Sequence, residues 1–286
     1  MRKTAPIPLE GRRVLITGAA RGIGAGTARR LYERGARVAL AGLEPELLEQ
    51  LAGECGDAPW FECDVADCAQ VELAVAGAVE RLGGLDVAIA NAGVGSQLPL
   101  IGGDPAIFES TIAVNVLGVY YTLRAAGPHI AHPRGYALAI ASLAAALHLP
   151  VIGAYNASKA AVEALGNTLR TELYGSGART GVAYFGFIDT DMVSRGLQTR
   201  AAEQIPRRRR AVTNPVPLAC AIDAIERGVQ RRSKRVTAPG WVAAVLPLRM
   251  LLQPLADFAG RSNLEETLAT AREEHAPLTT VQPDAR

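Results

Sequence analysis

Short apolar runs alternate with longer amphipathic stretches through the first two-thirds of the chain. The apolar runs are continuous, as expected of parallel strands whose two faces are both covered by helices. Six runs are predicted to be strands, at residues 13–17, 37–41, 60–63, 85–90, 136–141 and 181–185. The amphipathic stretches between them are predicted to be helices, at residues 23–33, 44–51, 67–82, 108–130 and 154–174.

This strict alternation of strand and helix predicts the fold class. Successive strand–helix–strand units with right-handed crossovers build a Rossmann-type, doubly wound parallel α/β sheet. A chain of 286 residues can bury one sizeable core, and no shift in composition marks an internal boundary. We therefore expect a single domain over residues 1–286, with a core at about 11–190, a helical substrate lobe at about 191–217 and a C-terminal tail at about 239–286.

The segment Thr17-Gly18-Ala19-Ala20-Arg21-Gly22-Ile23-Gly24 joins the first predicted strand to the first helix. Glycines permit a tight turn and let the backbone approach a pyrophosphate. The helix that begins here offers free N–H groups and the positive end of its dipole to phosphates. A glycine cluster alone is equally typical of a plain turn, but its place at the first strand–helix junction predicts dinucleotide binding.

Composition and charge narrow the function classes. The net charge of +2, with 49% hydrophobic and 20% charged residues, is typical of a globular protein and gives no general attraction for nucleic acid. The four cysteines show neither disulfide nor metal-site spacing, so we expect reduced thiols and no metal. The N-terminus lacks the apolar core of a signal peptide, and a cytoplasmic location is expected.

Three motifs in order resemble the short-chain dehydrogenase/reductase family: Thr17–Gly24, Asn91-Ala92-Gly93 after the fourth strand, and Tyr155-x-x-x-Lys159. Ser142 lies 13 residues before Tyr155, and Asn115 occupies the family's fourth catalytic position. The resemblance runs from about Gly11 to Ile188. It implies a nicotinamide-dependent oxidoreductase acting on a carbonyl/alcohol pair, packed as a homodimer or homotetramer through the helices at 108–130 and 154–174.

The residue types at these positions suit the transfer of a proton to or from a substrate oxygen. Tyr155 would exchange the proton with the substrate oxygen, which near pH 7 requires its pKa to fall by up to about 3 units, roughly 4 kcal/mol. Lys159 lies one turn along the same helix, where its charge favours the phenolate, and it could also hold the nicotinamide ribose. Ser142 would bind the substrate oxygen. The resemblance implies that Asn115 holds a water that relays protons. A non-catalytic dinucleotide sensor is the alternative, but both Tyr155 and Lys159 are present.

The residues expected to contact the cofactor lie in the glycine turn, at strand ends and on the Tyr155 helix. They are Gly18, Ala20, Arg21, Gly22, Ile23, Gly24, Gly42, Leu43, Asp64, Val65, Asn91, Ala92, Gly93, Tyr155, Lys159, Gly186, Ile188 and Thr190.

The end of the second strand bears on the choice of cofactor. Gly42 stands where binders of NAD commonly carry an acid, and it cannot repel a 2′-phosphate, which Arg21 could pair with. These features favour NADP(H). Glu44 could instead reach an unmodified ribose, which keeps NAD(H) as the alternative.

Two regions depart from the family pattern. Phe185 replaces the usual proline after the sixth strand, either as core or as apolar bulk beside the nicotinamide. The tail carries Pro239–Leu252 after the arginine-rich groups Arg207–Arg210 and Arg231–Arg235. These segments predict either a helix closing the substrate pocket, with solvated arginines, or peripheral contact with an anionic membrane. Either outcome favours a small hydrophobic substrate, such as a lipid- or steroid-like ketone or secondary alcohol.

Overall fold

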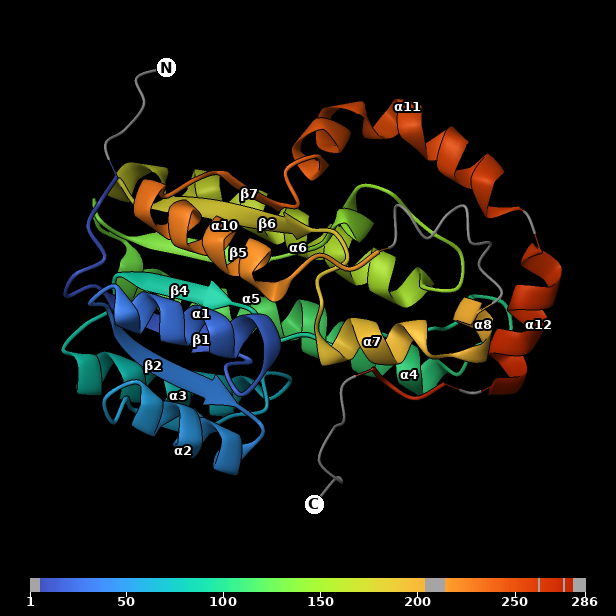
Figure 1. The fold of residues 1–286 in the computed structure, drawn as a ribbon. Coiled ribbons are helices and arrows are strands. Elements are labelled where there is room, and N and C mark those ends of the chain that lie inside the picture. The colour runs from blue at the N-terminus through green and yellow to red at the C-terminus, as the bar shows by residue number, and fades with distance from the viewer. Residues whose placement is uncertain (1–5, 204–213, 262, 275, 280–286) are drawn as a thin grey trace.

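A seven-stranded parallel sheet forms the middle layer of the protein (Figure 1). The structure is a computed structural model and describes residues 6–203, 214–261, 263–274 and 276–279. The strand order is β3-β2-β1-β4-β5-β6-β7, and every pairing is parallel, so the predicted doubly wound sheet is confirmed. The strands are β1 Arg13–Thr17, β2 Arg37–Gly42, β3 Trp60–Glu62, β4 Val87–Ala90, β5 Tyr136–Ile140, β6 Arg179–Phe185 and β7 Arg235–Ala238.

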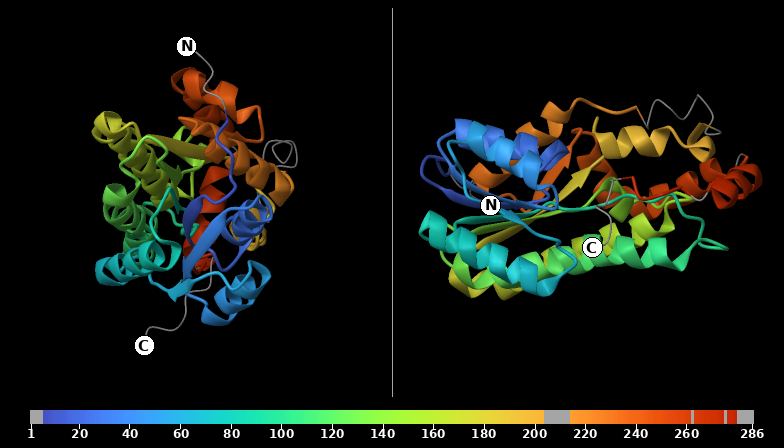
Figure 2. Two further views of the ribbon diagram at one scale, coloured as in Figure 1. Left: turned by 90° about the vertical axis from the view of Figure 1, so that its left-hand side faces the viewer. Right: turned by 90° about the horizontal axis from the view of Figure 1, so that it is seen from below.

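Helices cover both faces of the sheet, which explains why the strand runs are apolar throughout (Figure 2). Within β1, Val14 and Ile16 pack into one buried cluster, and Leu15 packs into the other on the opposite face. The first cluster includes residues of α1 Gly22–Glu33, α2 Pro45–Glu54 and α10 Leu218–Arg231. The second includes residues of α3 Cys68–Leu82, α5 Gly118–Ile130 and α6 Gly153–Glu172.

The structure adds two elements that the apolar pattern did not predict. Helix α10 packs on α1, and β7 extends the sheet beside β6. Strand β7 has only Val236 and Ala238 as apolar residues, too few for a strand signal. The buried positions of α10 recur at helical spacing, but they are mostly small: Ala221, Ala224, Ile225, Gly228 and Val229. Apolar and polar residues nevertheless separate onto two sides of α10, so its amphipathic pattern was a signal in the sequence that the prediction overlooked.

The long helix predicted at 108–130 is interrupted. It consists of α4 Pro105–Ile112, a π-helical turn at Ala113–Leu117 and α5. Single π-helical turns within helices are frequent at functional sites. The helix predicted at 154–174 is α6, followed by a 3₁₀ turn at Tyr174–Ser176. Both differences leave the predicted βαβ order unchanged.

The C-terminal part of the chain follows the sheet edge and then folds back over the substrate lobe (Figure 1). The lobe contains α7 Asp191–Leu197 and α8 Arg200–Glu203, and the tail contains α11 Val242–Gly260 and α12 Leu264–Glu274. The Glu274 carboxylate accepts hydrogen bonds from the backbone N–H groups of Arg200 and Ala201 at 2.8 and 3.2 Å, which ties α12 to α8. The arginine group at 207–210 lies outside the described residues.

Candidate active site

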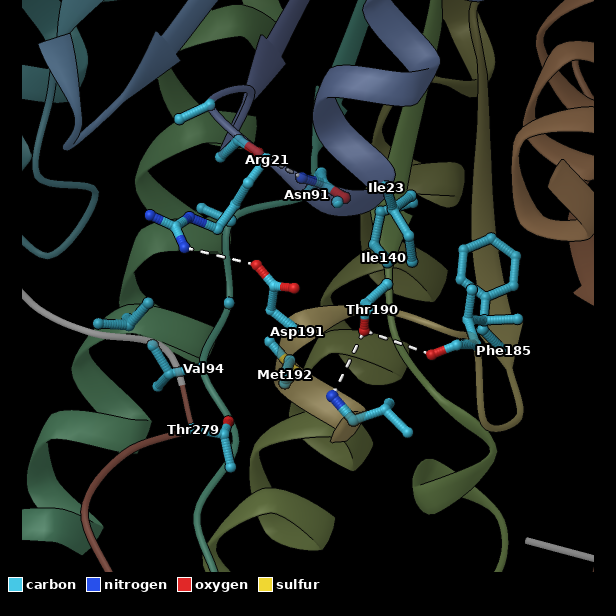
Figure 3. A pocket seen from close by; sticks show the side chains of 18 of the residues that line it. Arg21, Ile23, Asn91, Val94, Ile140, Phe185, Thr190, Asp191, Met192 and Thr279 are labelled. Carbon is cyan, nitrogen blue, oxygen red and sulfur yellow. Dashed lines mark hydrogen bonds and ion pairs between the residues drawn. The ribbon is translucent and has the colours of Figure 1, made fainter. Parts of the chain in front are cut away.

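A pocket of about 400 Å³ opens at the carboxyl ends of the strands. The sheet order reverses direction between β1 and β4, and crevices of this kind bind ligands in doubly wound folds. All the residues predicted to contact the cofactor line this pocket except Gly24, and Ser142 lines it as well (Figure 3). The structure thus brings together residues that span more than 170 positions of the sequence, although their roles remain predictions.

The glycine turn is shaped for close approach of a phosphate. Gly18 has φ +63°, and a Cβ on it would lie 2.6 Å from Ala92 Cα. A Cβ on Gly24 would overlap the Gly18 carbonyl oxygen, so Gly24 acts by letting α1 pack against the turn. The N-cap residue Arg21 forms no side-chain cap, and the first turn of α1 contains no acid. The N–H groups at this helix end therefore remain available to an anion.

Asn91 holds the turn in place from the end of β4. Its side-chain amide donates to the carbonyl oxygens of Thr17 and Gly18 at 2.9 and 3.0 Å, and its backbone N–H donates to the Thr17 hydroxyl at 3.1 Å. The amide of Asn91 therefore shapes the phosphate turn rather than pointing freely into the pocket. This cradle, with free N–H groups and no opposing acid in the first turn of α1, fits a pyrophosphate.

Ser142, Tyr155 and Lys159 meet at the base of the pocket. Ser142 follows β5, and its hydroxyl donates to the Phe185 carbonyl oxygen at 3.3 Å. Lys159 Nζ lies 5.5 Å from the centre of the Tyr155 ring and donates to the Ile140 carbonyl oxygen at 3.0 Å. Tyr155 and Lys159 share α6, so the spacing of one helical turn places both on the pocket side, as predicted.

Asn115 lies behind the pocket wall, fully buried in the π-helical turn. Its amide donates to the Val94 carbonyl and the Ser158 hydroxyl at 2.9 and 3.0 Å, and its oxygen accepts from the Val94 N–H at 2.8 Å. A Cβ on Gly93 would lie 3.1 Å from Asn115 Oδ1 and 3.3 Å from Lys159 Nζ. Asn115 thus holds the segment after β4 beside Lys159, and its relay role remains a prediction.

Comparison with known families fits this geometry. Residues 12–201 match the family model described as short chain dehydrogenase. The chain belongs to this family. It is an oxidoreductase that acts on the CH–OH/C=O pair with a nicotinamide cofactor.

The related dehydrogenases differ in what they act on. D-threitol dehydrogenase of Mycolicibacterium smegmatis is 36% identical over 176 residues, which cover 60% of this chain and 68% of the relative. 11-beta-hydroxysteroid dehydrogenase 1A of Arabidopsis thaliana is 31% identical over 268 residues, 88% of this chain and 75% of the relative. Glycine betaine reductase ATRR of Emericella nidulans is 34% identical over 211 residues, which cover 71% of this chain but 17% of that protein.

The solved structures confirm the fold of the dehydrogenase. A short chain dehydrogenase/reductase from Burkholderia phymatum, solved in complex with NAD, superposes with a TM-score of 0.75 at 24% identity. The match covers 87% of this chain and 96% of the other.

Burial shifts the pKa values of both Tyr155 and Lys159. It raises the pKa of Tyr155, because a buried phenolate is poorly solvated, and a hydrogen bond with Ser142 opposes that rise. Burial also lowers the pKa of Lys159 to about 8. The sequence predicted that the pKa of Tyr155 falls below its usual value. In the protein without a bound cofactor, burial outweighs the Ser142 hydrogen bond, and the pKa of Tyr155 rises instead. Tyr155 is therefore protonated at neutral pH and ready to act as an acid.

This pKa shift predicts opposite pH profiles for the two directions. Reduction needs the phenol and should stay constant from pH 6 to 7, where Lys159, with its pKa of about 8, keeps its charge. Oxidation needs the phenolate and should rise about tenfold per pH unit over the same range, because the pKa of Tyr155 lies above it. Ser142→Ala should move the oxidation profile to higher pH, since the hydrogen bond that lowers the pKa is lost. Initial rates in both directions test this, and oxidation that is independent of pH would contradict it.

Three charged residues lie together in the pocket lining, of which the sequence predicted Arg21 and Glu44 but not Asp191. Arg21 pairs with Glu44, and its second guanidinium nitrogen lies 3.7 Å from the Asp191 carboxylate (Figure 3). Asp191 starts α7, directly after Thr190, whose hydroxyl accepts from the Val193 N–H at 3.4 Å and so caps that helix. The proximity of Asp191 to Thr190 in sequence was the available signal for its place here.

Sequence reasoning missed Thr279. Its hydroxyl and backbone exchange hydrogen bonds of 2.9 to 3.1 Å with the backbone of Gly95, and the side chain lines the pocket beside Met192 (Figure 3). The two partners lie 184 residues apart, and no local pattern marks such a contact. Part of the tail therefore lines the pocket, but Thr279 lies beyond the segment Pro239–Leu252 that was predicted to close it, and that segment contributes no residue to the pocket lining.

Phe185 combines its two predicted alternatives. It is 4% exposed within the core, and it also lines the pocket. Next to it, the Gly186 N–H donates to the Ala238 carbonyl at 2.9 Å, so any contact from Gly186 to a cofactor uses its carbonyl.

Proposed function

We propose that this dehydrogenase interconverts a hydrophobic ketone and its secondary alcohol, with Tyr155 as the catalytic acid/base. The observation that carries the proposal is the meeting of Ser142, Tyr155 and Lys159 at the base of the nucleotide pocket. In reduction, Tyr155 donates its proton to the substrate oxygen as charge develops there. Ser142 donates a hydrogen bond to the same oxygen, and the Lys159 charge stabilises the phenolate that remains.

The described residues fit a nicotinamide dinucleotide, which when bound supplies or accepts the hydride. The glycine turn and the N-terminus of α1 would hold the pyrophosphate. Asp64 and Val65 would border the adenine, and Lys159 the nicotinamide ribose. Asp64 already accepts a hydrogen bond from the Ala66 N–H at 2.9 Å, so its carboxylate is held in a fixed orientation.

The hydrophobic substrate is supported by the apolar side chains of the pocket wall. Those beyond the nucleotide turn include Val94, Val114, Ile140, Met192 and Val193. The test is cofactor consumption against matched panels of long-chain ketones, aldehydes, steroid ketones and short polyols. We expect kcat/KM to rise with apolar chain length. A preference for polyols would overturn the substrate class while leaving the catalytic assignment intact.

We propose NADP(H) as the preferred cofactor, with Arg21 as the partner of the 2′-phosphate. A Cβ on Gly42 would lie 3.7 Å from the backbone nitrogens of Ala19 and Ala20, so the position has room for a side chain beside the turn. Gly42→Asp should shift preference toward NAD(H) at least tenfold, about 1.4 kcal/mol, because a carboxylate repels the phosphate and accepts ribose hydroxyls. Fluorescence titration with both reduced cofactors measures it.

Glu44→Gln supplies the companion test of cofactor choice. It frees Arg21 from its ion pair, so NADPH affinity should rise if Arg21 binds the phosphate. If the unaltered protein prefers NADH, and Glu44→Gln weakens NADH binding, then Glu44 is the ribose acceptor and the proposed preference is wrong.

We further propose a cytoplasmic homodimer or homotetramer that packs through α5 and α6. Two large hydrophobic side chains are exposed here: Leu117, directly before α5, is 39% exposed, and Tyr120, within α5, is 44% exposed. A partner subunit would cover both of them. Analytical ultracentrifugation of the full chain tests this assembly.

A further inference from the structure

Helix α11 packs on the body of the protein through apolar contacts at Val242 and Leu246 and through two polar contacts further along the helix. The Arg249 guanidinium donates to the Glu163 carboxylate of α6 at 2.9 and 3.0 Å. The Gln253 amide exchanges two hydrogen bonds, of 2.9 and 3.0 Å, with the backbone of His148. Together with buried Val242, these positions repeat every seven and four residues, so they lie on one side of the helix.

The side of α11 away from these contacts is apolar and exposed, and Figure 1 shows the helix at the edge of the molecule. Its exposure runs from 44% at Trp241 to 82% at Met250. The large apolar side chains exposed along it are Trp241, Leu248, Met250, Leu251, Leu255 and Phe258. The outward side of an ordinary surface helix is polar, so a contiguous apolar strip on that side indicates an interaction site.

A transmembrane arrangement does not fit α11. Among the residues that the structure describes, two helices are long and apolar enough to cross a bilayer, Pro105–Ile130 and Val242–Gly260. The most apolar 18-residue stretch is 33% buried in the first helix and 6% buried in the second. However, Arg249 and Gln253 commit one side of α11 to polar contacts with the protein. With one side held against the protein and the other side apolar, the helix suits an interface between water and lipid.

The surrounding charge favours an anionic surface over a second copy of the chain. Residues 231–261 carry one acid, Asp257, and six Lys and Arg side chains. Of these six, Arg249 pairs with Glu163 and Arg232 is buried, which leaves four exposed positive charges, at Arg231, Lys234, Arg235 and Arg261. Two such basic regions would repel each other in a symmetric dimer. A strip about 28 Å long and 10 Å wide also offers less than half of the roughly 800 Å² per partner that a stable dimer needs.

We propose that the outward face of α11 docks on an anionic membrane surface, with the helix lying parallel to it. The loop that α11 contacts at His148 leads from Ser142 to α6, which carries Tyr155. Docking therefore places the substrate side of the site at the lipid surface. On the basis of the proposed function, this identifies the substrate class as a carbonyl or alcohol dissolved in the bilayer.

Sedimentation with vesicles tests the docking without any substrate. The full chain should bind vesicles containing phosphatidylglycerol at least tenfold more tightly than phosphatidylcholine vesicles, and high salt should weaken that binding. The double variant Leu251→Glu/Phe258→Glu should lose binding at least tenfold. Leu73→Glu on α3, equally exposed at 73%, is the matched control and should bind normally.

Three outcomes would overturn the docking proposal. They are no binding to anionic vesicles at low salt, equal binding by the double variant, and a change in oligomeric state of the double variant, which would assign the strip to a second copy. Activity on a water-soluble ketone should be unchanged in the double variant. Failure of that activity in the unaltered chain would count against the proposed function alone.

Discussion

Replacing Tyr155 with phenylalanine should lower turnover at least a hundredfold and leave cofactor affinity within a factor of two. The substitution removes only the hydroxyl that exchanges the proton, while the ring still fills its place beside Lys159. Single-turnover reduction of a confirmed substrate and fluorescence titration of the cofactor measure the two effects. Turnover that survives within a factor of a few would show that another group transfers the proton.

Tyr136→Phe is the matched control. Its hydroxyl is also buried and donates to the Ser233 carbonyl at 2.9 Å, but it lies outside the pocket lining. Loss of that hydrogen bond should cost stability on the order of 1 kcal/mol and leave turnover unchanged.

Replacing Lys159 with alanine should damage both steps, lowering turnover at least a hundredfold and cofactor affinity at least tenfold. The Lys159 ammonium lies close enough to the Tyr155 ring to favour the Tyr155 phenolate. Its position next to Gly93 also suits a contact with the nicotinamide ribose. Steady-state kinetics and titration separate the two losses. Lys159→Met keeps most of the buried volume without the charge and should behave alike, which distinguishes a charge effect from a cavity. Cofactor affinity that stays intact in both variants would remove the ribose role.

The sequence predicted most of the nucleotide half of the site because its signals are local. Each glycine, strand end and helical turn that carries a predicted residue is decided by neighbours within a few positions, and the alternation of elements then brings the strand ends together. The same reasoning did not find β7, whose edge position needs few apolar residues, or Thr279, whose contact with Gly95 depends on the path of the whole tail.

The sequence also could not predict the electrostatics of the site. The spacing of Tyr155 and Lys159 predicted their proximity, but the sign of the pKa shift of Tyr155 depends on how deeply the fold buries it. Likewise, the pairing of Arg21 with Glu44 places opposite charges at the position that we propose selects the cofactor. Burial and pairing of this kind are properties of the assembled pocket.

The π-helical turn at Ala113–Leu117 makes the length of the chain part of the active site. Deleting one residue there would let the segment wind as a continuous α-helix with α4 and α5 nearly in place, because a π-helical turn holds about one residue more than an α-helical turn, and the side chains within the turn would change direction. Asn115 would then leave the backbone groups of Val94 that it now bonds. A scan of substitutions would miss this dependence, whereas single-residue deletions and insertions would reveal it, so this turn is where natural variation in length should be least tolerated.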